Sequence, residues 1–148
     1  MSLSNLQAIG RLPPLPPDPA GMAKLLHAAR QNLADARVEQ VSNGNRFDAA
    51  YKCILQCAML GLWANGWRTS TSQPGHHQTA IQTLDQTLGL PKPDLIVLDA
   101  LRRQRNVNDY EGDPIADATL QACLQAADKL LALTLQWLQS HHPEWHLT

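Results

Sequence analysis

The sequence predicts an all-α protein, an up-down bundle of four long helices with one shorter helix. Apolar residues recur with a period of 3.6 residues from Met22 to Leu33 and again from Leu120 to Leu138, which is typical of amphipathic helices. No segment alternates with a period of two residues beside hairpin-type turns, so we expect no strands. Clusters of glycine, proline and asparagine separate the periodic segments.

Five segments carry the helical pattern. We expect helices over residues 19–40, 46–65, 76–88, 94–109 and 115–140. The second segment has the broadest apolar stripe, so we expect it to be the most deeply buried helix. The third is the short helix, and the other four are long enough to form an up-down bundle.

The breaks between these helices have recognisable chemistry. Asp18-Pro19 supplies an N-cap and a first-turn proline to the first helix. Ser42-Asn43-Gly44 is expected to end it, with the glycine as its left-handed cap. Proline and glycine break the chain again at residues 89–93 and 111–114, and Asp94 is the expected N-cap of the fourth helix.

The length of 148 residues favours one domain. We divide the chain into a proline-rich N-terminal arm (residues 1–18), a helical bundle (residues 19–140) and a C-terminal tail (residues 141–148). Residues 11–19 hold five prolines, which favour an extended conformation. Arg11 and the prolines after it also match the spacing of an SH3 ligand, but we favour an arm that leads into the bundle.

Composition excludes several classes of protein. The chain is 44% hydrophobic and 17% charged, with a formal net charge of −1. These values exclude collagen, a disulfide scaffold, a strongly basic nucleic-acid binder and a fully disordered chain. The start has no signal-peptide pattern, and the longest apolar stretch, around residues 58–64, is too short for a membrane helix. We therefore expect a cytoplasmic protein with no membrane contact.

Cysteine and histidine occur in patterns that we considered as metal sites. Cys53 and Cys57 share one helical face, and His76 and His77 are the nearest further ligands in the sequence. Paired cysteines in an apolar helix behave mostly as small buried hydrophobes. A histidine-rich tract at residues 141–146 is interrupted by proline. We expect neither a metal nor a cofactor.

The most informative stretch is the end of the fourth helix. Arg102, Arg105 and Asp109 lie three and four residues apart on one face, and Asn106 and Tyr110 form the adjacent row. The same face is apolar at Leu95 and Leu98 and charged from Arg102 onward. We therefore expect its charged end to lie outside the core, at a cleft or at a partner. The alternative is a set of exposed ion pairs in which the arginines only complement the helix dipole.

The order of these segments resembles the HEPN superfamily, small helical bundles of prokaryotic toxin–antitoxin and defence systems. The resemblance covers about residues 20–140. It rests on an alanine-rich first helix (28–36), a second helix that opens with Arg46–Tyr51, and alanines in the last helix (122–127). Its most specific part is Arg105-Asn106-x-x-Asp109-Tyr110, which is similar to an uncharacterised branch whose motif closes with Asp-Tyr.

The resemblance implies a dimer with a shared site. Nuclease members carry an arginine and, after four to six intervening residues, a histidine, and they cleave RNA without metal by attack of a ribose 2′-hydroxyl. Here the position after four intervening residues is Tyr110, and tyrosine, with a pKa of about 10, is a poor base at neutral pH. Some members pair with a small nucleotidyltransferase.

The leading prediction is therefore a dimeric RNA- or nucleotide-binding module with a degenerate ribonuclease site. Arg102, Asn106 and Asp109 are its candidate binding residues. An alternative is an active, metal-independent endoribonuclease that uses Arg105 and Tyr110 as catalytic residues. A third is a purely structural interaction bundle. Acidic residues that follow the motif would repel phosphates, so we expect a small site rather than a long nucleic-acid surface.

Aromatic residues near the end of the second helix form one further candidate. Trp63 and Trp67 lie close to Arg68, and such a group can stack a nucleobase. We favour a structural role, with Trp63 in the core and Trp67 packed over the end of the bundle.

Overall fold

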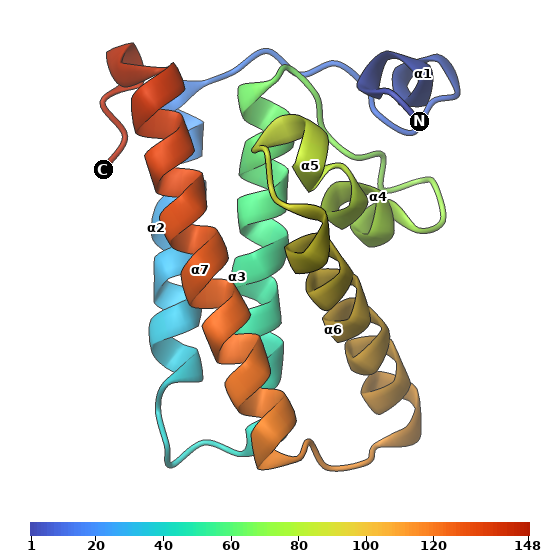
Figure 1. Ribbon diagram of the computed structural model, residues 1–148, viewed down its shortest axis with the longest axis vertical. Helices are drawn as coiled ribbons and strands as arrows, with labels where there is room; N and C mark the ends of the chain where they lie inside the picture. Colours follow the sequence, from blue (N-terminus) through green and yellow to red (C-terminus); the bar gives the residue numbers. More distant parts are fainter.

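Four long helices run alternately down and up the molecule, as predicted (Figure 1). The computed structural model describes all residues 1–148. The long helices are α2 (Pro19–Ala36), α3 (Asn43–Ala64), α6 (Lys92–Glu111) and α7 (Asp117–His141). The short ones are α1 (Leu3–Ala8), α4 (His76–Gln82), α5 (Leu84–Thr87) and a 3₁₀ turn η1 (Pro143–Trp145). The fold is all-α, with no strand.

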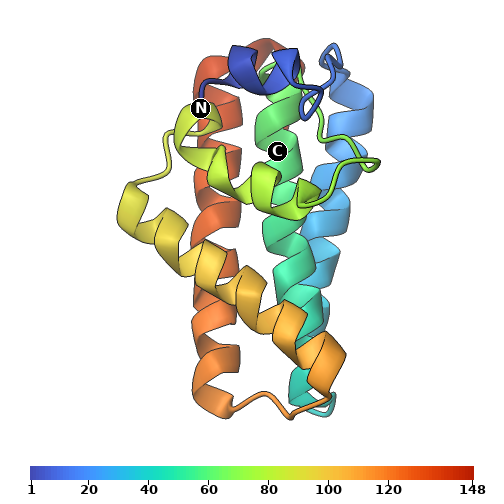
Figure 2. The same cartoon turned by 90° about the vertical axis from the view of Figure 1, so that its right-hand side faces the viewer.

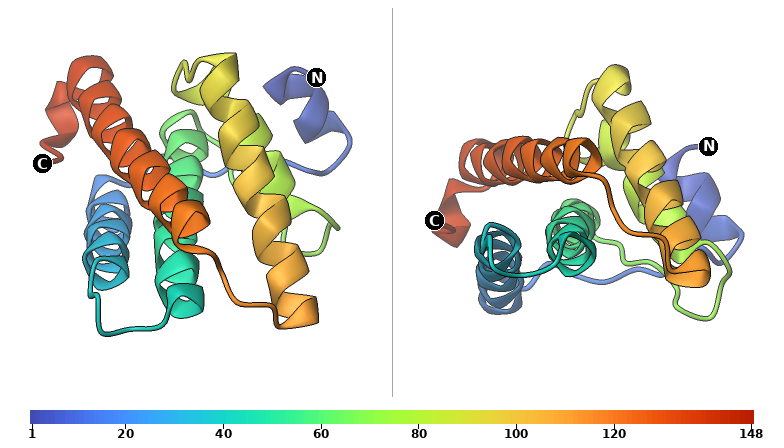
Figure 3. Two further views of the ribbon diagram at one scale, coloured as in Figure 1. Left: turned by 60° about the horizontal axis from the view of Figure 1, so that its bottom comes forward. Right: turned by 90° about the horizontal axis from the view of Figure 1, so that it is seen from below.

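Helix α3 is the central element of the bundle. It packs against α2 along its length and against α7, and it also touches α4, α5 and α6. Figure 2 shows α6 crossing obliquely over α3 and α7, and in Figure 3 α7 lies over α2 and α3. The sequence explains this position, because α3 is apolar on most of its circumference. Its buried side chains include Phe47, Tyr51, Ile54, Cys57, Ala58, Leu60 and Leu62.

Residues 1–18 pack against the bundle and contribute to its core. Leu12 is fully buried. The Leu15 amide donates to the Gly66 carbonyl at 2.8 Å, and the Arg68 amide donates to the Pro13 carbonyl at 3.0 Å. The segment therefore lies antiparallel to residues 66–70, and it crosses the top of the bundle from α1 to α2 (Figure 1). These bonds tie down the part of the chain that matches an SH3 ligand.

The junction between α2 and α3 differs from the prediction. Helix α2 ends at Ala36 rather than near residue 40, and Gly44 lies in the first turn of α3 instead of capping α2. Arg46 explains the early end, because its Nε donates to the Ala36 carbonyl at 2.8 Å. That bond satisfies one of the free carbonyls at the end of α2 without a left-handed residue.

The third predicted helix is split in two. Thr83 separates α4 from α5, and its hydroxyl donates to the carbonyls of Thr79 (2.9 Å) and Ala80 (3.1 Å). Such back-bonding competes with the regular helical pattern. Helix α6 begins earlier than predicted, with Pro91 at the N-cap. Asp94 lies in its first turn and forms an ion pair with Lys129 of α7, 2.8 Å apart.

None of the helices combines the length and the apolar composition required to cross a membrane.

Candidate functional site

The end of α6 brings Arg105 against α3. The Arg105 guanidinium lies over the ring of Tyr51, with Cζ 5.0 Å from the ring centroid. This is within the range of a cation–π interaction. The Arg105 side chain is 29% exposed, whereas Tyr51 is buried. Arg105 is therefore held against the wall of the bundle instead of extending into solvent.

Two carboxylates flank Arg105 without forming hydrogen bonds to it. Asp48 Oδ1 lies 3.9 Å from Arg105 Nε, and Asp109 Oδ2 lies 3.7 Å from Arg105 Nη2. Both distances are too long for a hydrogen bond. As a result, the buried Arg105 Nε has no hydrogen-bond partner, and the buried Tyr51 hydroxyl has none either. The contact between α6 and α3 thus contains two buried polar groups, Arg105 Nε and the Tyr51 hydroxyl, that lack a hydrogen-bond partner.

Arg102 has a different environment. Its Nε donates to Asp99 Oδ1 at 3.0 Å, and the side chain is 12% exposed. Arg103 binds the other carboxylate oxygen of Asp99 at 3.0 Å from the outside of the helix, with its side chain 71% exposed. Asp99 is therefore a buried carboxylate held by two arginines, and it neutralises much of the charge that Arg102 would offer to a ligand.

Helix α4 adds a histidine to this site. The His77 ring lies 6.3 Å from the Tyr51 ring, centroid to centroid, and 4.5 Å from the ring of His76. Burial lowers the pKa of His77 below its ordinary value of 6.5, and the positive charges of His76, Arg105 and Arg102 lower it further. His77 is therefore a neutral imidazole at pH 7, able to accept a proton or a hydrogen bond.

Burial also affects the protonation of Tyr51 and Asp48. It raises the pKa of Tyr51 to about 12, against the lowering effect of Arg105 and Arg102. Tyr51 is thus a phenol at neutral pH and can donate a hydrogen bond. Burial and the negative charge of Asp109 raise the pKa of Asp48, while Arg105 lowers it. Asp48 and Asp109 therefore share the charge of one guanidinium, at 3.9 and 3.7 Å from its nitrogens.

The other predicted residues of α6 point elsewhere. Tyr110 is 92% exposed, and Asn106 is also exposed. No hydrogen bond joins Tyr110 to Arg105, whose guanidinium lies over Tyr51 instead. Arg102, Arg105 and Asp109 share the face that turns towards α3 and α4, whereas Asn106 and Tyr110 lie on the solvent side of α6.

Sequence reasoning did not assign Asp48, Tyr51 or His77 to this site. The ring of Tyr51 belongs to the broad apolar stripe of the second predicted helix, and that pattern gives no sign of a role for its hydroxyl. The available signal was the spacing of Asp48 and Tyr51, three residues apart on one helix face. Nothing in the sequence indicated that α6 would bring an arginine to that face.

The side chains considered as metal ligands have other roles here. Cys53 and Cys57 are buried. In the terminal tract, the His141 ring stacks on Trp137 and the His142 ring stacks on Trp145, with ring centroids 4.3 and 3.8 Å apart. No group of three or more histidine, cysteine or acidic side chains lies close enough to hold a metal ion.

The tryptophans considered as a base-stacking surface are both anchored through their indole N–H groups. Trp63 Nε1 donates to the Pro16 carbonyl at 2.9 Å, and Trp67 Nε1 donates to Gln7 Oε1 at 2.8 Å. Both bonds hold residues 1–18 against the end of α3 and the loop after it. Trp63 is only partly buried and packs against a small apolar cluster, so the prediction that it lies in the core is wrong.

Comparison of the chain with known protein families, with curated proteins and with solved structures gives no match. The resemblance to the HEPN superfamily therefore stays a prediction, and the functional conclusions depend on the chain's own residues.

Proposed function

We propose that the chain is a HEPN-like module that binds one phosphate group of an RNA or nucleotide beside Arg105 and acts as a dimer. One observation carries the proposal: Arg105 Nε and the Tyr51 hydroxyl are buried donors without a partner. Leaving such groups unsatisfied costs about 1–3 kcal/mol each. A phosphate oxygen brought against the Arg105 guanidinium and the Tyr51 ring would accept such hydrogen bonds, and the arginine would supply charge-assisted recognition.

The flanking carboxylates limit the size of the ligand. Asp48 and Asp109 lie within 4 Å of Arg105, and Asp99 already holds Arg102. A long nucleic acid would meet these acids and the acidic run after Asp109, which repel a polyanion. A single phosphate needs only the two unsatisfied donors and the neutral imidazole of His77.

An exposed row of residues on α6 supports the dimer. Ile96, Ala100, Arg103, Val107 and Tyr110 are all exposed and follow one another at spacings of four and three residues. This spacing is typical of the seam between two packed helices. A second copy on this row buries two β-branched apolar side chains and places Tyr110 at the interface, where it can reach the site of the other copy.

His77 favours a second candidate function, a metal-independent endoribonuclease. A general base must be unprotonated at the working pH, and the lowered pKa of His77 meets this requirement. In this alternative His77 takes the proton of the ribose 2′-hydroxyl and Arg105 stabilises the negative charge that develops on the phosphate. Tyr110 contributes only across a dimer.

The resemblance also supplies the setting of the proposal. We place the protein in the cytoplasm, in a toxin–antitoxin or defence system with a small nucleotidyltransferase as a candidate partner. The third function, a purely structural bundle, is favoured by the Arg102–Asp99 ion pair, which holds α6 together without any ligand.

Phosphate binding is tested by equilibrium binding of labelled total RNA and of AMP, without metal, at two salt concentrations. Arg105→Gln and Tyr51→Phe are expected to weaken binding at least tenfold. Arg37→Gln is the matched control, because it also removes an arginine from an ion pair, the one with Asp128 at the far side of the bundle. Equal binding by all four proteins, or no binding by the wild type, rejects the proposal in favour of the structural bundle.

Two further measurements separate the remaining alternatives. Light scattering reports the dimer, which Val107→Glu is expected to dissociate, whereas Val38→Glu, another exposed valine outside the row, leaves it intact. Gel analysis of the RNA reports cleavage. Cleavage that is lost in His77→Gln supports the ribonuclease, and binding without cleavage supports the degenerate site.

A further inference from the structure

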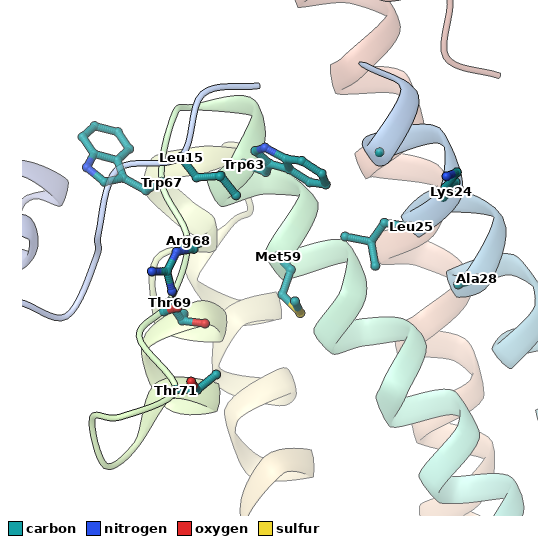
Figure 4. Close-up of a pocket in the computed structure, with 11 residues that line it drawn as sticks. Leu15, Lys24, Leu25, Ala28, Met59, Trp63, Trp67, Arg68, Thr69 and Thr71 are labelled. Carbon is teal, nitrogen blue, oxygen red and sulfur yellow. Dashed lines mark hydrogen bonds between the residues drawn. The ribbon is translucent and has the colours of Figure 1, made fainter. Parts of the chain in front are cut away.

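A second candidate site lies at the opposite face of α3 from α7, between α2, the end of α3 and the loop that follows it. It is a groove of about 570 Å³ (Figure 4), a size within the usual range for small-molecule sites. Its apolar lining comes mainly from Leu15, Leu25, Met59 and Trp63. None of these residues belongs to the Arg105 site, so the groove is a separate feature.

The groove is held open by fixed contacts. Trp63 is anchored through its indole N–H to the Pro16 carbonyl. Gly21 lets this indole lie directly against α2, because a Cβ at that position would come within 2.6 Å of the ring. Met59 is 40% exposed in the groove, although α3 is otherwise the most buried helix. Met59 is thus an apolar side chain that stays exposed beside the fixed indole of Trp63.

Two cationic side chains, Lys24 and Arg68, lie on opposite walls of this groove. Figure 4 shows Lys24 on α2 and Arg68 on the loop after α3, with Met59 and Leu25 between them. Neither cation forms an ion pair with a carboxylate: Lys24 has none, and the Arg68 side chain donates only to the Thr69 carbonyl. No acidic residue lines the groove; Asp18 lies beside Gly21 but outside the lining.

We infer that this groove binds a free medium-chain fatty acid, with the alkyl chain on the apolar floor and the carboxylate at Lys24 or Arg68. The flexible thioether of Met59 and the aliphatic side chains suit an alkyl chain. The unpaired cations complement a single negative charge. A nucleobase would instead require both donors and acceptors along its edges, and apart from the two cations the lining offers only the side chains of Thr69 and Thr71 for that purpose.

Isothermal titration with decanoate below its micellar concentration tests the inference. The expected result is binding at one equivalent per chain, with affinity lowered by up to about fivefold in each of Lys24→Gln and Arg68→Gln. Lys92→Gln is the matched control, because Lys92 is an exposed lysine outside the groove without an ion pair. Met59→Glu places a negative charge on the floor and is expected to abolish binding. Because Met59 is exposed, this variant is expected to keep its helical circular dichroism and its melting temperature.

Other ligands and one variant of the Arg105 site complete the test. Decyltrimethylammonium carries the same alkyl chain with the opposite charge, and it is expected not to bind. Absence of decanoate binding by the folded wild type overturns the inference, as does equal binding of the two amphiphiles. Binding of AMP that Met59→Glu abolishes also overturns it, in favour of a nucleotide. Arg105→Gln is expected to leave decanoate binding unchanged, so failure here and failure of phosphate binding are distinguishable.

Discussion

Arg105 of α6 covers the ring of Tyr51 of α3, and both residues present a buried polar atom that binds nothing in the chain. The cation–π contact explains why the pair forms, since the ring face attracts the guanidinium. It does not satisfy the Tyr51 hydroxyl. Phenylalanine at position 51 would pack equally well, so the hydroxyl of Tyr51 adds nothing to the packing of α6 on α3.

Tyr51→Phe is therefore expected to separate stability from binding. Removing an unsatisfied buried hydroxyl should raise the free energy of unfolding by about 1 kcal/mol, which corresponds to about 2–4 °C in melting temperature for a chain of this size. Phosphate binding should fall in the same variant. Thermal melts followed by circular dichroism provide the measurement, with Ser4→Ala, which removes an exposed hydroxyl outside the Arg105 site, as a control that changes neither value. A loss of stability in Tyr51→Phe would indicate that the hydroxyl is satisfied in solution.

The two arginines that hold Asp99 are expected to differ sharply in their effect on stability. Arg102→Leu leaves a buried carboxylate with one exposed partner and should cost about 3 kcal/mol. Arg103→Leu removes only that exposed partner and should cost no more than about 1 kcal/mol. Urea denaturation measures both values. Equal losses would mean that Asp99 is hydrated and not held mainly by Arg102.

His77 is expected to make the protein less stable in mild acid. Its pKa is lowered in the folded chain by burial and by the neighbouring His76, Arg105 and Arg102. Between about pH 6.5 and the lowered folded-state pKa, the unfolded chain binds more protons, so the free energy of unfolding falls as the pH drops. His77→Gln should flatten this part of the curve in urea titrations at several pH values. His27→Gln, at an exposed position on α2, is the control, and an unchanged slope in His77→Gln would assign the effect to another group.

Leu12 is expected to behave as a core residue although it lies outside the four-helix bundle. Because the side chain is fully buried, Leu12→Ala should lower the free energy of unfolding by about 2–5 kcal/mol. Ile9→Ala, at an exposed position three residues earlier, should change it by no more than about 0.5 kcal/mol. Chemical denaturation of the two variants tests this. A small effect of Leu12→Ala would show that residues 1–18 detach readily from the bundle.

The four long helices could be predicted because their apolar periodicity is sustained over many turns. Their ends could not be predicted as well, because they depend on contacts between distant residues. Gly44 looked like a cap for α2, but the Arg46 side chain performs that role, and the glycine became part of α3. Similarly, α1 is only six residues long and owes its position to the packing of Leu6 and Leu12.

The candidate site was predictable only in part. The spacing of Arg102, Arg105 and Asp109 correctly indicated one face, since it depends on helix geometry alone. The orientation of that face, and hence its partners Tyr51 and His77, depends on the angle at which α6 crosses α3, which local sequence does not encode. For the same reason, the exposure of Tyr110 could not be read from its position beside Arg105.

The pairing of residues 13–15 with residues 66–68 has a consequence for biosynthesis. A ribosome releases the first of these segments long before the second, so the arm emerges with nothing to pair with until α2 and α3 have both been made. The wall that carries Leu15 and the loop that carries Arg68 can therefore pair only after residues 66–68 have been made. The groove is thus absent from the nascent chain while the first two long helices are being synthesised.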